Sequence, residues 1–286
     1  MNEQLTFETL ISVENLSNIL GESQLIIFDC RFDLADTEVK RGDYLTSHIP
    51  GAFYAHLDEN LSSPILPDTG RHPLPDVADL VGWLASCGFD GSQQVIVYDD
   101  SFGAMATRLW WLLKCLGHEA VAVLDGGWQA WLSAGKSTTA DIPENIPAIY
   151  NPIFNMSEVI TTDDVEVNLT RSQFMLVDVR ANERFIGARE LIDPVAGHIP
   201  GAINIPLTDN LAENGCYLSQ QELKKLYQQV VNQQEDENLV FMCGSGVTAC
   251  HSILAMVVAG FNRPKVYAGS WSEWIRNASR PVATDS

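Results

Sequence analysis

The chain has 286 residues, 46% of them hydrophobic, which is enough to build the cores of two ordinary domains. Its formal net charge of -20 repels the phosphates of nucleic acids and anionic membranes, so neither is expected as a partner. It contains no apolar run of the roughly 18–20 residues that a membrane-spanning helix needs, and its acidic N-terminus does not resemble a signal peptide. We therefore expect a cytoplasmic protein.

The six cysteines do not form a metal-binding pattern. There is no Cys-x-x-Cys pair, and Cys243, Cys250 and His251 lack the second pair of ligands that a zinc site needs. Free thiols are the default in a cytosolic chain of this size. We expect no metal and no cofactor, and we expect most of the cysteines to be small buried residues.

Both halves of the chain follow the same plan of secondary structure. The first half predicts a helix after Ser12, strands at 25–29 and 94–98, a helix at 104–116 and a strand at 120–124. The second half predicts a helix from Thr162, strands at 174–179 and 238–242, a helix at 247–259 and a strand at 265–267. Continuous apolar strands that alternate with helices are typical of an α/β fold whose parallel sheet is covered by helices on both faces.

Three segments occur twice in the same order, which indicates a duplicated domain. HIPGA at 48–52 recurs at 198–202, IFDCR at 27–31 is echoed by LVDVR at 176–180, and VLDGGWQAW at 123–131 by VYAGSWSEW at 266–274. The stretch 137–155 is rich in Pro, Thr and Asn and shows no periodicity. The sequence therefore predicts an N-terminal domain at 1–138, a linker at 139–158 and a C-terminal domain at 159–286.

The loops after the second long strand of each copy differ in chemistry. Ligands of open α/β sheets bind beyond the carboxyl ends of the strands, here after Tyr98 and Met242. An offset of 143 residues places Asp100 where the second copy has Cys243. One copy thus has a nucleophile and the other has none, which predicts a single active site in the C-terminal domain.

The surroundings of Cys243 predict a reactive thiolate. Gly244 and Gly246 let the backbone curl so that successive N–H groups face inward, and a helix starting at Val247 adds the positive end of its dipole. Both effects lower the pKa of a cysteine. The alternative is that Cys243 is only a small residue at a tight turn. Hydroxyl donors are available from Ser245 and Thr248.

The ordered set of repeated motifs, together with Cys-Gly-Ser-Gly-Val-Thr at 243–248, resembles the tandem-domain rhodanese family. The loop is most similar to that of the 3-mercaptopyruvate sulfurtransferases, and the resemblance covers nearly the whole chain. It implies an inactive N-terminal rhodanese-like domain and a catalytic C-terminal one that carries sulfur as a persulfide on Cys243. Pyruvate or sulfite leaves the donor, and a thiol such as thioredoxin, a small thiol or cyanide then takes the sulfur.

The charge of the loop bears on the donor. Family members that prefer thiosulfate tend to carry Arg or Lys inside the loop, and residues 243–248 contain neither. We therefore expect 3-mercaptopyruvate as the donor, with thiosulfate:cyanide sulfurtransferase activity as the alternative. An arginine must then hold the donor's carboxylate. Arg184 matches the family's substrate arginine, and Arg189 stands in for a second one whose segment departs from the family pattern.

The resemblance also implies that the loop serine works with a histidine and an aspartate of the N-terminal domain. These are assigned to Ser245, His48 and Asp36, the nearest aspartate. The alternative for His48 is that it only shapes the turn before Pro-Gly, because both copies have this histidine, His48 and His198, and only one copy has a nucleophile.

Two other functions compete with this interpretation. A cysteine phosphatase needs an arginine six residues after its nucleophile to clamp the phosphate, and Ala249 stands there. A non-enzymatic sulfur-relay or protein-binding module is the alternative from another class, and the intact nucleophile loop argues against it.

Overall fold

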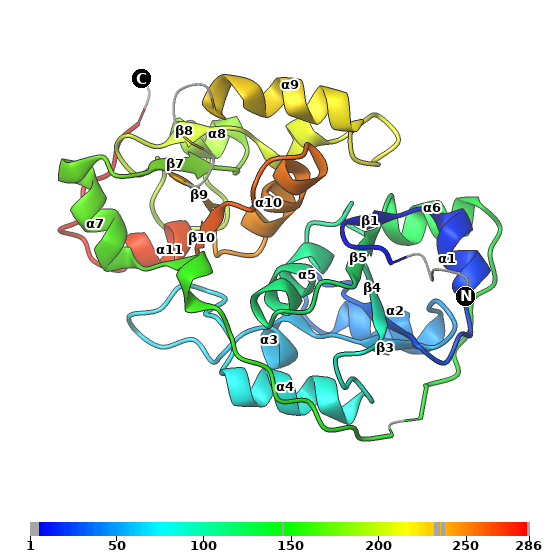
Figure 1. Ribbon diagram of the computed structural model, residues 1–286. Coiled ribbons are helices and arrows are strands. Elements are labelled where there is room, and N and C mark those ends of the chain that lie inside the picture. Colours follow the sequence, from blue (N-terminus) through cyan, green and yellow to red (C-terminus); the bar gives the residue numbers. More distant parts are fainter. Residues whose placement is uncertain (1–5, 145, 232–234, 236–237, 285–286) are drawn as a thin grey trace. The chain divides into compact units, whose positions relative to one another are not determined.

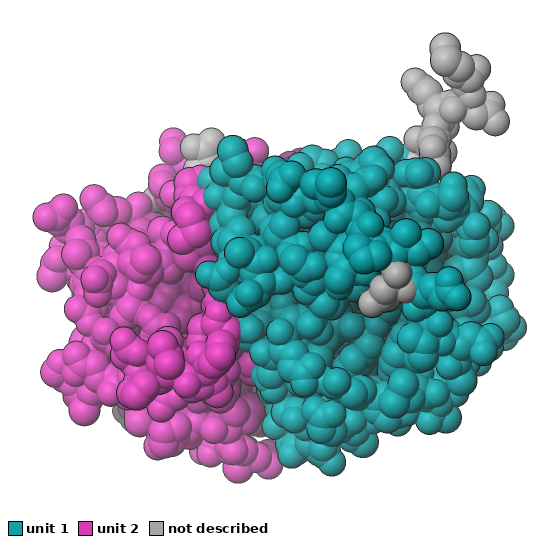
Figure 2. Space-filling view, turned by 90° about the horizontal axis from the view of Figure 1, so that it is seen from below, with its two compact units in different colours: residues 1–62, 75–155 teal, residues 63–74, 156–286 magenta. Residues whose placement is uncertain are grey.

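The computed structural model describes residues 6–144, 146–231, 235 and 238–284. Two compact units make up the chain (Figure 2): unit 1 comprises 1–62 with 75–155, and unit 2 comprises 63–74 with 156–286. Within the described residues, no helix combines the length and the apolar character that crossing a membrane requires.

This division differs from the predicted one, in which an N-terminal domain at 1–138, a linker at 139–158 and a C-terminal domain at 159–286 follow one another. The stretch after 138 packs on unit 1, because Thr139 O accepts the N–H of His48 at 2.9 Å and the N–H of Asn155 reaches Cys115 O at 2.8 Å. In the other direction, residues 63–74 leave the first half of the sequence and pack in unit 2. We name residues 63–74 the strap.

Unit 1 is built on a parallel sheet (Figure 1). Its strands are β1 (Leu10–Ile11), β2 (Leu25–Asp29), β3 (Ala52–Tyr54), β4 (Gln94–Tyr98) and β5 (Val121–Leu124), in the order β1-β5-β4-β2-β3. Its helices are α1 (Val13–Ile19), α2 (Val39–Thr46), α3 (Leu57–Asn60), α4 (Val77–Ser86), α5 (Ala106–Cys115) and α6 (Gly127–Ser133).

Unit 2 repeats this topology. Its strands are β6 (Val159–Ile160), β7 (Met175–Asp178), β8 (Ile203–Asn204), β9 (Leu239–Met242) and β10 (Lys265–Tyr267), in the order β6-β10-β9-β7-β8. Its helical segments are η1 (Met156–Glu158), α7 (Thr162–Arg171), α8 (Asn182–Phe185), η2 (Leu207–Asn210), α9 (Gln220–Val231), α10 (Ala249–Val258) and α11 (Ser270–Trp274). The same strand order in both units confirms the duplication.

The central strand β9 of unit 2 is apolar at every residue because both faces of the sheet are covered. Val240 and Met242 on β9 pack in one core with Trp271 and Trp274 of α11. The residue between them, Phe241, points to the opposite face, because successive side chains of a strand alternate. There its ring meets the ring of Tyr227 from α9, with the centroids 6.1 Å apart. The predicted arrangement of helices on both faces is thus confirmed.

The three repeated motifs meet at the carboxyl end of each sheet. In unit 2, Arg180 forms a buried ion pair with Asp178 at 2.6 Å, lies 4.6 Å above the ring of Trp271, and donates to Gly197 O at 2.7 Å just before HIPGA. The guanidinium therefore ties the strand end, the tryptophan helix and the HIPGA turn together. Unit 1 repeats this arrangement with Asp29, Arg31, Trp128 and Ser47.

Candidate active site

Cys243 directly follows β9 and is 1% exposed. The start of α11 holds its backbone: the N–H of Trp271 donates to Cys243 O at 3.1 Å, and the N–H of Cys243 donates to Ser270 Oγ at 3.1 Å. The Sγ atom accepts the N–H of Gly246 at 3.2 Å. The sulfur therefore points into the concave side of its own loop, toward a backbone N–H.

The two glycines of the loop are required for different reasons. Gly246 has a φ of +77°, and a Cβ there would overlap the carbonyl oxygen of Ala268. A Cβ on Gly244 would lie 2.8 Å from Nη2 of Arg71 and 3.7 Å from both Nη atoms of Arg184. Gly246 thus allows the tight turn, and Gly244 leaves room for two guanidinium groups beside Cys243.

The end of the loop leads into α10. Val247 is buried, and Thr248 is the N-cap residue, although its side chain makes no capping hydrogen bond. The helix begins at Ala249, two residues after the predicted start at Val247.

The residue of unit 1 that corresponds to Cys243 is Asp99, which corrects the assignment of Asp100. β2 pairs Asp29 with Tyr98, and β7 pairs Asp178 with Met242, so the next residue is Asp99 in one unit and Cys243 in the other. The offset at this point is 144 residues. It falls to 143 only after the loop, because the loop of unit 1 is longer by one residue before its helix begins.

The contacts of Asp99 show that the loop of unit 1 binds a negatively charged group. Its buried carboxylate accepts four backbone N–H groups, those of Ser101 (2.8 Å), Gly103 (2.9 Å), Met105 (2.8 Å) and Ala106 (2.8 Å). Burial raises the pKa of Asp99, and these four donors oppose the rise. The loop of unit 1 is thus an anion cradle occupied by its own carboxylate, and unit 2 offers the corresponding cradle to a sulfur.

Replacing Asp99 by Asn should destabilise the protein. The amide keeps one acceptor oxygen but turns an N–H₂ group toward two of the four backbone donors, which we expect to cost about 2–5 kcal/mol. Urea unfolding followed by tryptophan fluorescence measures the loss. The control is Asp100→Asn, which removes only a partly exposed ion pair with Lys40 (2.7 Å) and should cost less than about 1 kcal/mol. Equal effects of the two variants would contradict the cradle.

Arg184, the candidate substrate arginine of the sequence analysis, lies beside Gly244 of the loop. Its Nε donates to Glu190 Oε2 at 2.9 Å, its Nη2 donates to Asp193 Oδ2 at 2.9 Å, and its Nη1 faces Gly244. Arg71 from the strap reaches the same place and pairs with the other oxygen of Asp193. Two guanidinium groups therefore flank the nucleophile loop, held by carboxylates behind them.

The two supporting carboxyl groups differ in their proton affinity. Burial raises the pKa of Asp193, and the attraction of Arg71 and Arg184 only partly offsets that rise. Burial also acts on Glu190, but the hydrogen bond from Arg184 and two backbone N–H groups outweigh it and lower the pKa of Glu190. Glu190 thus stays ionised more readily than Asp193. Glu190 pairs with Arg184, whereas Asp193 pairs with both Arg71 and Arg184.

Arg189 is exposed, and its backbone N–H donates to Glu183 O at 3.0 Å. The structure brings Arg71, and not Arg189, to Gly244 beside Arg184. Arg71 is thus the better candidate for the second arginine.

Ser245 contacts a histidine, but not the one that the sequence assigned to it. Ser245 Oγ lies 2.7 Å from Nδ1 of His72, and both side chains are buried. His48 instead stacks on Tyr44, and its two ring nitrogens lie 2.7 Å and 3.1 Å from the carbonyl oxygens of Tyr44 and Asp141. The assignment of His48 as the partner of the serine is therefore corrected to His72.

The histidines of the two HIPGA segments have the same surroundings. His198 stacks on Phe185 and lies 2.8 Å from its carbonyl oxygen, as His48 does with Tyr44. This agreement supports the alternative that both histidines shape a turn. Asp36 is exposed, and its carboxylate accepts the N–H of Glu38 at 3.2 Å, so it is engaged in a local turn of unit 1.

Sequence reasoning missed both Arg71 and His72, yet the sequence contains a signal for them. The repeat aligns Asn60 with Asn210 at the offset of 150, but residues 62–75 in the first copy correspond to the much shorter 212–218 in the second. The strap is thus an insertion found in one copy only. An insertion that carries an arginine and a histidine in a chain with few basic residues was a candidate for the site.

One group in the described part of the chain has metal-ligand composition: Glu38, His56 and Glu59 in unit 1. Arg41 pairs with both glutamates, at 3.1 Å and 2.6 Å. Nδ1 of His56 accepts the N–H of Asp58, which leaves its Nε2 as the donor to a carbonyl oxygen. These contacts already engage the atoms that a metal ion would need.

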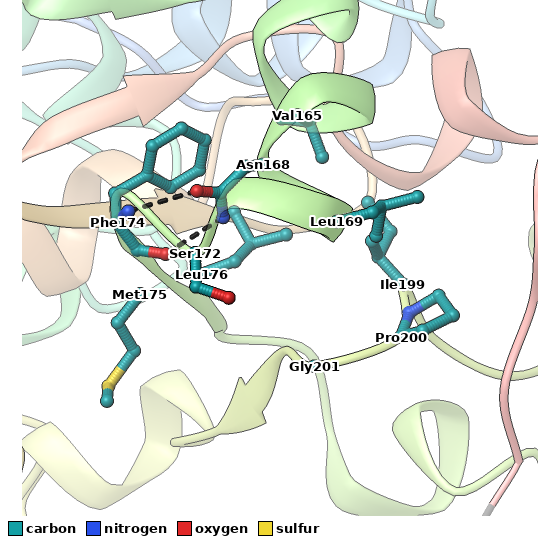
Figure 3. A pocket seen from close by; sticks show the side chains of 10 residues that line it. All are labelled: Val165, Asn168, Leu169, Ser172, Phe174, Met175, Leu176, Ile199, Pro200 and Gly201. Atoms are coloured by element: carbon teal, nitrogen blue, oxygen red, sulfur yellow. Dashed lines mark hydrogen bonds between the residues drawn. The ribbon is translucent and has the colours of Figure 1, made fainter.

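Unit 2 also contains a hollow of about 250 Å³ (Figure 3). α7, the first residues of β7 and the turn at 199–201 line it. The side chain of Asn168 bonds to the backbone of Phe174 at 2.8 Å and 3.0 Å, as the dashed lines show (Figure 3). Cys243, in contrast, follows the carboxyl end of β9, and none of the residues 243–248 lines this hollow.

Comparison with known proteins decides the family. A model described as a rhodanese-like domain matches residues 12–134 and again 161–277. The chain belongs to the rhodanese-like domain family. Over 277 residues it is 43% identical to a probable 3-mercaptopyruvate sulfurtransferase of Pseudomonas aeruginosa, which covers 96% of this chain and 98% of the relative.

Two further rhodanese-family relatives agree with this placement. A thiosulfate sulfurtransferase of Mus musculus is 34% identical over 292 residues, with 97% of this chain and 95% of the relative covered. The structure of 3-mercaptopyruvate sulfurtransferase from Leishmania major matches with a TM-score of 0.82 at 32% identity, covering 93% of this chain and 74% of that one. The predicted tandem rhodanese fold and sulfurtransferase class are confirmed, and the rhodanese-type enzyme has a sulfur donor and a sulfur acceptor.

Proposed function

We propose that this sulfurtransferase takes sulfur from 3-mercaptopyruvate as a persulfide on Cys243 and passes it to a thiol or to cyanide. The observation that carries the proposal is the pairing of a buried sulfur in a backbone cradle with two guanidinium groups, Arg71 and Arg184, at the adjacent Gly244. The donor has a carboxylate that such a pair can bind and a sulfur that the cysteine can attack.

In the first half-reaction the Cys243 thiolate attacks the sulfur of 3-mercaptopyruvate. An S–S bond forms, the C–S bond breaks, and its electron pair leaves as the enolate of pyruvate, which then takes a proton. Ser245 and His72 form the pair proposed to supply that proton, because Ser245 Oγ lies 2.7 Å from the imidazole. In the second half-reaction an acceptor thiolate or cyanide attacks the outer sulfur and releases the Cys243 thiolate.

The proton step predicts different effects for the two donors. Ser245→Ala and His72→Asn should each lower kcat with 3-mercaptopyruvate by about 100-fold, the usual range for losing an acid–base group. Thiosulfate releases sulfite, which needs no carbon protonation, so its kcat should fall by less than about tenfold. Steady-state kinetics with both donors measures this. His48→Asn is the matched control, and a larger loss with it than with His72→Asn would contradict the proton pair.

Thiosulfate is the second candidate donor, and one observation favours it. The loop itself contains no basic residue, but Arg71 and Arg184 bring two positive charges to it, which suits a dianion. The Mus musculus relative is also named for thiosulfate. Side-by-side kcat/KM values with cyanide as the acceptor distinguish the donors. We expect 3-mercaptopyruvate to be preferred at least tenfold, and a ratio below one would replace it with thiosulfate.

The acceptor and the location complete the proposal. A thiol acceptor, either thioredoxin or a small thiol, attacks the persulfide in the same way as cyanide does. All six cysteines are free thiols, which supports a location in the reducing cytoplasm.

A further inference from the structure

The strap delivers two side chains of the proposed site, yet it comes from the first half of the sequence and packs in unit 2. Arg71 pairs with Asp193, and His72 contacts Ser245. In the proposed reaction a substrate carboxylate competes with Asp193 for Arg71, and a proton moves at His72, so both side-chain contacts change during turnover. Something else must then keep the backbone of the strap in place.

One side of α11 and the residues just after it bind the strap through its backbone. Ser272 Oγ accepts the N–H of Arg71 at 3.0 Å, and Glu273 Oε2 accepts the N–H of Gly70 at 3.4 Å. Two residues after the helix ends, Arg276 Nε donates to Thr69 O at 2.9 Å. Three consecutive strap residues are thus hydrogen-bonded by Ser272, Glu273 and Arg276, which we name the clamp.

The fit between clamp and strap is close. Gly70 is not in a left-handed conformation, but a Cβ there would lie 2.7 Å from Gly269 O and 2.9 Å from Ser272 Oγ. On the other side of Glu273, a Cβ on Gly269 would overlap its carboxylate. Glu273 also accepts the hydroxyl of Thr162, which fixes the orientation of the carboxylate. Both glycines therefore serve close approach to the clamp.

The duplicated domain provides an internal comparison. α6 of unit 1 keeps both tryptophans of α11, but Gln129 and Ala130 stand in place of Ser272 and Glu273, and Ser133 stands in place of Arg276. Gln129 uses its side chain within its own unit, donating to Asp100 O at 3.0 Å. The tryptophans thus belong to the shared fold, whereas the clamp residues occur only in the unit that receives a strap.

We propose that Ser272, Glu273 and Arg276 are positioning residues that hold the strap backbone so that Arg71 and His72 reach the Cys243 loop. The expected change in KM and kcat rests on the proposed function. The expected position of the strap does not. Each clamp hydrogen bond contributes about 1 kcal/mol. Removing one of them should therefore raise the population of the opened strap about fivefold, and removing all three should raise it about 100-fold.

Trypsin tests the structural part, because the bond after Arg71 lies inside the clamped segment. The variant Ser272→Ala/Glu273→Ala/Arg276→Ala should be cut after Arg71 about 100 times faster than the wild type, since cleavage follows the population of the opened strap. Mass spectrometry identifies the fragments, and circular dichroism checks the fold. The matched control is Gln129→Ala on α6, which should leave this cleavage unchanged.

Kinetics tests the positioning part. Glu273→Ala should raise KM for 3-mercaptopyruvate about fivefold or more and lower kcat, because both Arg71 and His72 shift. Glu273→Gln keeps an acceptor for Gly70 and should restore both values to within about twofold. Glu273→Gln behaving like Glu273→Ala would overturn the role of the hydrogen bond.

Three results would separate the inference from the proposed function. A triple variant that stays protected from trypsin overturns the clamp, whatever the donor is. Faster cleavage with unchanged KM and kcat overturns the positioning role. The strap would then open more often without any effect on the site. A wild type without turnover of 3-mercaptopyruvate contradicts the proposed donor and leaves the proteolytic result to decide the clamp.

Discussion

Cys243→Ser should abolish sulfur transfer with either donor, lowering kcat by at least about 1,000-fold. The serine hydroxyl can still accept the N–H of Gly246, so the loop keeps its shape, but an alkoxide is not available near neutral pH and an O–S adduct is not an effective carrier of sulfur. A continuous assay of pyruvate release measures the loss.

The control is Cys216→Ser, in the same unit. Cys216 is only partly buried and lies in the turn between Leu211 and Tyr217. Its replacement should leave kcat within about twofold of the wild type. Retained turnover in Cys243→Ser, with an unchanged urea midpoint, would show that another thiol is the carrier.

Arg184→Ala should raise KM for 3-mercaptopyruvate about 100-fold. The substitution removes one of the two guanidinium groups beside Gly244, and a charged hydrogen-bonding pair with a carboxylate contributes about 1.5–3 kcal/mol. It also leaves Glu190 and Asp193 buried without that partner, so we expect lower thermal stability as well. Initial rates measured well below the unfolding temperature separate the two effects.

Two further variants test whether the effect comes from the planar guanidinium group of Arg184. Arg184→Lys keeps the positive charge but not the planar pair of donors, and should recover only part of the affinity. Arg189→Ala changes an exposed side chain and should leave KM within about twofold. A larger effect from Arg189 than from Arg184 would mean that the carboxylate binds elsewhere.

The repeat and the apolar strands were sufficient to predict the fold. Strand β9 is apolar at every residue because α11 covers one face and α9 the other, and this pattern is local enough to read from the sequence. The DxR and tryptophan motifs were recognised as repeats, but their purpose was not. Only the structure shows that Arg180 lies over Trp271 and ties both motifs to the HIPGA turn.

The shape of the Cys243 loop could be predicted because everything that determines it is close in sequence. Gly244, Gly246 and the following helix all lie within a few residues of Cys243. Its partners could not be predicted in the same way. Arg71 and His72 reach the loop only because an insertion in the first copy packs in unit 2, and no local pattern records that path.

The alignment of the two copies failed by one residue for a similar reason. A single offset of 143 fits the segments after the loops, but the register of the strands places Asp99 opposite Cys243. The extra residue in the loop of unit 1 conceals this in the sequence. With the correct pair, the buried carboxylate of Asp99 and the sulfur of Cys243 occupy corresponding positions in the two loops, and each accepts backbone N–H groups of its own loop.

The most direct measurement is the mass of the Cys243 peptide after the protein has been treated with 3-mercaptopyruvate in the absence of an acceptor. The peptide should gain the mass of one sulfur atom, about 32 Da, and fragmentation should place it on Cys243 and not on Cys250. Addition of cyanide should remove it as thiocyanate. An unmodified Cys243 alongside released pyruvate, or added mass on a different cysteine, would contradict the account.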